Sequence, residues 1–208
     1  MKRPTSTLCL SIVLLALCAA SCGSGGGNVP GGMMGGLLTA TFTPDNATPG
    51  MNSISMQTGT ELDDTFQIIV RVTDIVDFFG AAFRITFDSA SAEFLSFDGS
   101  TSFLDGTGAV VDIRATVDPG NSGTVFVVAT LQNSITYVQG LTPAAPDDTL
   151  LILTFRATDP TAGNAFTFGT VMNREVTTCE FWDMIVAQPG CPEISATVTW
   201  DGGTMTAL

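Results

Sequence analysis

The sequence predicts an all-β sandwich or barrel, and three observations point to it. Apolar residues come in short runs rich in β-branched side chains, and Gly, Pro, Asp and Asn separate the runs, as is typical of strands and turns. Eight or nine such runs follow one another along the chain. No segment keeps the 3.6-residue period of an amphipathic helix. The 208 residues, 45% of them hydrophobic, are enough for one domain with a substantial core.

The runs are predicted strands, and several of them alternate between apolar and polar residues, as half-buried strands do. The polar faces of the two clearest runs carry Ala82, Arg84 and Thr86, and Asp112, Arg114 and Thr116. The predicted strands are residues 66–72, 82–87, 94–97, 110–117, 124–131, 149–155, 166–168, 194–200 and 204–208.

One predicted strand, residues 124–131, is apolar on both faces. A strand in a two-sheet sandwich normally shows one polar face, so the sequence leaves open which side of this strand points inward. Its outer side is either covered by a loop or presented to a partner as an apolar patch.

The N-terminus has the pattern of an export signal. Lys2 and Arg3 precede an apolar run at residues 8–20, which is shorter than the roughly 20 residues that span a bilayer. Small residues then lead to Cys22, and this arrangement resembles a bacterial lipoprotein signal. We expect residues 1–21 to be removed and Cys22 to carry lipid, which would anchor the protein to the bacterial cell envelope, at the outer membrane or cell surface. An ordinary signal peptide that leaves Cys22 as a free thiol is the alternative.

The segment that follows the signal is rich in Gly and Ser. Residues 22–50 are interpreted as a flexible tether, and residues 51–208 as the folded domain. A short extra strand at residues 37–42 is the alternative within the tether.

Two cysteines remain once the signal peptide and the lipid site are set aside. The chain has five cysteines, and Cys9 and Cys18 leave with the signal. An exported protein meets an oxidising environment, so we expect a disulfide between Cys179 and Cys191. Two buried free thiols are the alternative.

Composition excludes several kinds of chemistry. The chain has no histidine, so a Ser-His-Asp or Cys-His site cannot be built, and zinc chemistry is disfavoured. We therefore expect that the protein is not an enzyme and binds no cofactor. The sequence also contains no calcium-binding loop of the EF-hand pattern. With 20 acidic against 7 basic residues, the surface disfavours nucleic acid and anionic lipid headgroups. This acidity serves solubility, or it attracts a basic or calcium-loaded partner.

The order of the motifs resembles the cohesin domain over about residues 53–208. Gly80–Asp88 followed by residues 94–97 is similar to a family signature, with Phe87-Asp88-Ser89 standing where Tyr-Asp-Pro is usual. Residues 123–125, 150–155 and 199–204 match later strands of the family. The resemblance implies a jelly-roll β-sandwich of about nine strands.

The resemblance also implies a function. Cohesins bind dockerins, which are calcium-loaded modules, through one flat sheet face, so a non-catalytic module linked to polysaccharide use is expected, with calcium on the partner. The implied partner face carries Arg84, Thr86, Asp112, Arg114, Ala129, Leu131 and Gln132. Gly80 and Ala82 depart from the family pattern, because cellulosomal cohesins carry polar residues there.

A carbohydrate-binding module on the same kind of fold is the alternative function, because fold does not decide function. Trp182 and Trp200 are the candidate sugar-stacking residues, although we expect both to pack structurally. A hydrolase is the weakest hypothesis, since the sequence shows no activated nucleophile or base.

Overall fold

The structure is a computed structural model, and it describes residues 38–105, 110–132, 137–138, 140, 142–143, 147–179, 182–183 and 191–208. The expected signal peptide, Cys22 and most of the expected tether lie outside these residues. The prediction of an all-β sandwich is confirmed: the described part forms strands arranged in two large sheets and contains no α-helix. It also contains no helix with the length and apolar character that crossing a membrane requires.

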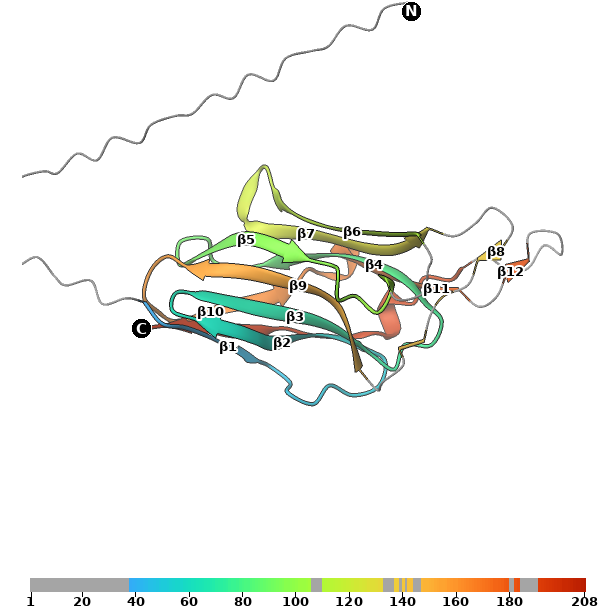
Figure 1. The fold of residues 1–208 in the computed structure, drawn as a ribbon, viewed down its shortest axis with the longest axis horizontal. Helices are drawn as coiled ribbons and strands as arrows, with labels where there is room; N and C mark the ends of the chain where they lie inside the picture. The colour runs from blue at the N-terminus through green and yellow to red at the C-terminus, as the bar shows by residue number, and fades with distance from the viewer. Residues whose placement is uncertain are drawn as a thin grey trace, which may run out of the picture. The chain divides into compact units, whose positions relative to one another are not determined.

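The two large sheets form the layers of the sandwich (Figure 1). The larger sheet has the order β1-β14-β10-β4-β7-β6, with β11 also pairing with β4. Its strands are β1 (Ala40–Pro44), β14 (Gly203–Ala207), β10 (Thr161–Phe168), β4 (Phe78–Thr86), β7 (Asn121–Gln132), β6 (Val110–Asp118) and β11 (Arg174–Thr178).

The second sheet has five strands in the order β13-β2-β3-β9-β5. These are β13 (Thr199–Asp201), β2 (Ser53–Leu62), β3 (Thr65–Thr73), β9 (Asp147–Ala157) and β5 (Ala92–Asp98). The short strands β8 (Tyr137–Val138) and β12 (Trp182–Asp183) pair beyond one end of the sandwich (Figure 1). Two 3-10 turns, η2 (Val171–Asn173) and η3 (Ser195–Thr197), complete the described elements.

A cluster of phenylalanine rings joins the two layers. Phe66 and Phe155 come from the five-stranded sheet, and Phe166 comes from the opposite sheet. The Phe155 ring lies 5.7 Å from Phe66 and 5.0 Å from Phe166, between ring centroids, and all three residues are fully buried. Such ring pairs stabilise a fold by about 0.5–1.5 kcal/mol beyond the burial of their area. This cluster fixes the two sheets face to face.

The expectation that residues 22–50 are entirely tether is wrong for β1. Ala40 and Phe42 are buried, and β1 runs antiparallel to β14 with Phe42 opposite Met205. The backbone N–H of Phe42 donates to the Glu61 carboxylate at 2.6 Å. The folded domain therefore includes β1 and begins well before Met51. The structure agrees better with the alternative prediction, an extra strand at residues 37–42, where apolar residues alternate with threonine.

The strands differ in two further ways from the prediction. The described residues form more strands than the nine expected, because short pieces such as β11 were not predicted. The predicted strand at residues 194–200 is instead η3 followed by β13. One local and one long-range hydrogen bond hold the turn: Thr197 N–H donates to the Ile194 carbonyl at 2.8 Å, and the Ser195 hydroxyl accepts from Val176 N–H of β11 at 2.8 Å.

Candidate binding face

The three strands that carry the implied partner face lie side by side in the order β4-β7-β6. Their outward residues form rows across the sheet. One row is Ala82, Val128 and Arg114, and the rows on either side of it are Gly80, Thr130 and Asp112, and Arg84, Phe126 and Thr116. The alternation predicted for β4 and β6 is confirmed, since Phe83 and Ile85 are buried while Arg84 is not. Strands distant in sequence thus build one continuous surface.

The structure decides the orientation of β7. Val125 and Val127 point into the core, whereas Phe126 is half-buried and Val128 is 38% exposed on the outer side. No loop of the described part covers Val128, so the outer side of this strand is an open apolar surface rather than a covered one.

Two residues expected on the partner face are in the core instead. Ala129 is fully buried and Leu131 is 3% exposed. Both share the inward side of β7 with Val125 and Val127, because side chains alternate along a strand. The expectation for Ala129 and Leu131 is therefore wrong, and their outward neighbours take their place on the surface. Gln132 is exposed at the end of β7, as a surface role requires.

The charged residues of the face have different partners. The Arg84 guanidinium lies over the Phe126 ring, 4.4 Å from its centroid. Arg114 donates from Nε to the Asp112 carboxylate at 2.7 Å, with 75% of its side chain exposed. The arginines are not direct neighbours, because β7 lies between β4 and β6. An ion pair this exposed contributes only about 0–1 kcal/mol to stability.

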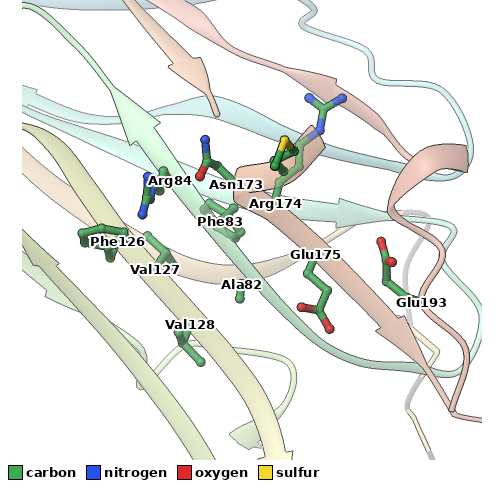
Figure 2. Close-up of a pocket in the computed structure, with 11 residues that line it drawn as sticks. Ala82, Phe83, Arg84, Phe126, Val127, Val128, Asn173, Arg174, Glu175 and Glu193 are labelled. Atoms are coloured by element: carbon green, nitrogen blue, oxygen red, sulfur yellow. The ribbon is translucent and has the colours of Figure 1, made fainter. Parts of the chain in front are cut away.

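A groove runs along β4 on this face, and Gly80 and Ala82 form its floor. It consists of two hollows of about 350 and 300 Å³, which share Ala82, Val128 and Glu175 as lining residues. We call the two hollows together the β4 groove. Figure 2 shows the larger hollow, with Phe126 and Val128 on the β7 side and Glu175 and Glu193 on the opposite side. The small side chain of Ala82 leaves room in the larger hollow, whereas Thr130 packs over Gly80.

The second wall of the groove was not predicted from the sequence. It is β11, which pairs with β4 so that Glu175 lies opposite Ala82 and Thr177 opposite Gly80. Val176, between these two residues, is fully buried. This alternation is present in the sequence, but with one apolar residue it is too short to identify a strand. Beside this wall, η2 presents Met172, which is 94% exposed.

The predicted disulfide between Cys179 and Cys191 is present, and it shapes the rim of the groove. The two Cα atoms are 4.5 Å apart. Two residues beyond Cys191, Glu193 forms an antiparallel bridge with Thr177 of β11. Next to this bridge, the Ile194 N–H donates to the Val176 carbonyl at 2.8 Å. The disulfide therefore ties the returning chain to the end of β11 and places Glu193 at the groove.

Removing the disulfide is expected to lower stability. The variant carrying Cys179→Ala and Cys191→Ala should lose about 3 kcal/mol of unfolding free energy, because the open loop regains entropy in the unfolded chain. Urea unfolding of the variant and of the unchanged protein measures this loss. As a control, a thiol reductant should lower the midpoint of the unchanged protein and leave that of the variant unaltered. Equal midpoints for both proteins without reductant would contradict the prediction.

The tryptophans offer no open platform in the described part. Trp200 is half-buried and contacts Phe168 and Phe83, with centroid distances of 5.0 and 5.7 Å. The Arg174 guanidinium lies on its ring at 5.2 Å. This confirms a structural role for Trp200. The backbone of Trp182 pairs with Val138, and its side chain lies outside what the structure describes.

Among known proteins, similarity to this chain is found in solved structures and not in sequence comparisons. No protein-family model matches the sequence, and no curated protein matches it. Similar solved structures include several cohesin modules. The third cohesin of ScaC from Acetivibrio cellulolyticus, solved with the ScaB dockerin, is 12% identical, with a TM-score of 0.47 over 67% of this chain and 86% of its own.

Two further cohesins extend the comparison. A type II cohesin domain from the cellulosome of Acetivibrio cellulolyticus is 9% identical, with a TM-score of 0.46 over 81% of this chain and 95% of its own. A non-cellulosomal cohesin from the archaeon Archaeoglobus fulgidus is 14% identical, with a TM-score of 0.40 over 79% of this chain and 88% of its own. Cohesin is also the family that the sequence motifs resemble. The two-sheet architecture of this chain is established by its own strand registers.

Proposed function

We propose that this protein is a non-catalytic interaction module that binds a partner protein of the dockerin type on the outer face of β11, β4, β7 and β6. The observation that carries the proposal is the β4 groove, an open hollow on a sheet face with one apolar wall and charged side chains around it. Exposed apolar surface framed by polar residues is typical of protein interaction sites.

The residues of the face support a protein partner. Val128 and Met172 are exposed without any covering element in the described part, and Phe126 lies beside them as a half-buried aromatic residue. Aromatic and arginine side chains supply much of the binding energy in protein interfaces, and Arg84 already stacks on Phe126. The order of the sequence motifs, which resembles that of cohesins, supports a dockerin as this partner.

The absence of catalysis is supported by composition. The chain contains no histidine, the commonest general base in enzymes. Lipid attachment at Cys22, placement at the cell envelope and a link to polysaccharide use belong to the same proposal. The sequence of residues 1–22 supports the anchor, and the resemblance to cohesins supports the link.

Binding to dockerins tests the proposal directly. Residues 38–208 are passed over immobilised calcium-loaded dockerins, with and without a chelator, and over insoluble polysaccharides. We expect micromolar or tighter binding to at least one dockerin, lost when the chelator unfolds the calcium-dependent partner. Retention on a polysaccharide without dockerin binding would replace the proposal by a carbohydrate-binding module. Binding to neither panel would contradict a dockerin-type partner.

A further inference from the structure

We propose that the β4 groove receives a basic side chain, Arg or Lys, from an amphipathic segment of the partner protein. Its charged end would lie between Glu175 and Glu193, and its aliphatic stem would lie against Phe126 and Val128. The inference rests on the proposed function and names the chemistry of the partner.

Two glutamates give the acidic side of the groove its negative charge, and no ion pair within the described residues offsets that charge. Glu175 and Glu193 are exposed, and in the described part no basic side chain pairs with either. The Thr177 hydroxyl donates a long hydrogen bond, of 3.5 Å, to the Glu175 carboxylate. The bridge between Thr177 and Glu193 holds the backbone of Glu193 beside β11, and both glutamates line the larger hollow. A basic group arriving from outside therefore meets two acceptors at one rim.

The two arginines that line the larger hollow are engaged elsewhere. Arg84 lies over the ring of Phe126, and Arg174 lies over the ring of Trp200. In Figure 2, Arg174 extends away from Glu175, and Arg84 lies at the Phe126 end of the hollow. The groove therefore has a positively charged end at Arg84 and a negatively charged end at the two glutamates.

The dimensions and polarity of the groove suit the stem of a basic side chain. Arg and Lys place their methylene groups along apolar surface and keep the charged head in a polar environment. Val128 provides apolar surface directly across Ala82 from Glu175. At Gly80 a Cβ atom would come within 2.7 Å of the Thr130 hydroxyl oxygen, so the Thr130 side chain already covers this end of the floor. The room for a long side chain therefore lies in the larger hollow, beside Ala82.

The charge of the whole protein favours the same partner. With 20 acidic and 7 basic residues, the chain has a net charge of −13, which attracts basic segments and repels polyanions. Charge complementarity at a docking surface also raises the association rate and sets specificity. A basic protein segment is therefore the occupant that fits both the groove and the overall charge.

The test compares two double variants with the same change in net charge. Glu175→Gln with Glu193→Gln neutralises the groove. Asp63→Asn with Asp159→Asn neutralises two exposed residues elsewhere, in the turn between β2 and β3 and in the link between β9 and β10. The probes are three synthetic peptides of equal length with identical leucine positions and with lysine, glutamine or glutamate at all other positions. Binding is measured at physiological ionic strength, where the screening length is about 8 Å.

We expect the unchanged protein to bind the lysine peptide and neither of the other two. The groove variant should bind the lysine peptide about tenfold more weakly, and the turn variant should change its affinity less than about twofold. Equal losses in both variants would show attraction by net charge alone and would overturn the inference. Failure of the lysine peptide to bind, or equal binding of the glutamine peptide, would overturn it as well.

A third variant separates this inference from the proposed function. Ala82→Leu extends a side chain into the hollow and leaves the acidic residues in place. Ala82→Leu could abolish dockerin binding while the double variant Glu175→Gln with Glu193→Gln does not weaken it. In that case the face is the docking surface, and the inference that it receives a basic side chain is wrong. If neither variant changes the affinity of a bound dockerin, the face itself is not the docking surface. Thermal unfolding confirms that each variant is folded.

Discussion

A chain that begins at Met51 instead of Leu38 is expected to be strongly destabilised, because it lacks β1. That strand closes one edge of the larger sheet and inserts Phe42 between the layers, where it is 2% exposed. The Phe42 ring lies 5.9 Å from the Phe166 ring and 6.3 Å from the Phe66 ring, between centroids. Removing a buried phenylalanine side chain costs about 3–5 kcal/mol, a large part of the roughly 5–15 kcal/mol that stabilises a typical domain.

Urea unfolding of residues 38–208 and of residues 51–208 measures this effect. The substitution Phe42→Ala in the longer chain should account for most of the loss, and Thr43→Ala serves as the control because Thr43 is exposed on the same strand. Equal stability of the two chains would mean that β1 adds nothing to the domain. A large loss in the Thr43→Ala variant would show that an exposed side chain of β1 matters as much as Phe42 and would contradict the assignment to Phe42.

The substitution Val128→Arg is expected to weaken binding of a dockerin partner by about 30-fold or more. Val128 lies at the centre of the face, in the row that joins Glu175, Ala82 and Arg114. Central apolar residues of an interface contribute about 2 kcal/mol or more when truncated or blocked. An arginine at this position would fill the groove and repel a basic partner. Because the side chain is 38% exposed, the fold should tolerate the change.

The matched control is Leu62→Arg, which adds the same charge and bulk at an exposed apolar residue of β2 in the other sheet. Isothermal titration with a bound dockerin gives both affinities, and thermal unfolding checks both folds. If the two variants weaken binding equally, the effect is one of net charge and the face is not the docking surface. If Val128→Arg leaves affinity unchanged, Val128 lies outside the interface.

The sequence predicted much of the strand pattern because of the two-residue period. In β4 and β6, polar and apolar residues alternate, so the buried side can be assigned before the structure is known. In β7 both sides are apolar, so the period left the inward side open. The family resemblance then placed Ala129 and Leu131 on the surface, whereas both are in the core. The two-residue period cannot show which side of a strand is buried when both of its sides have the same polarity.

The candidate site was predicted only in part. Arg84, Thr86 and Asp112 came from a resemblance to a family, and the structure places their strands in one sheet. Glu175 and Glu193 were missed, because nothing near them in the sequence indicates a groove. Their position depends on pairing between β11 and β4 and on the bridge to Thr177, which are long-range contacts. Local patterns cannot show such contacts.

By itself, the sequence determined the all-β class, the exclusion of histidine chemistry and the disulfide between Cys179 and Cys191, because composition, period and cysteine count depend on the chain alone. Only the tertiary structure decided that β1 belongs to the domain, that β7 exposes Phe126 and Val128, and that β11 forms a wall of the β4 groove. The reason is the same in each case. Strands distant in sequence hydrogen-bond to one another, as β1 does with β14 across 165 residues at Thr41 and Thr206, and which side chains meet is settled by that pairing.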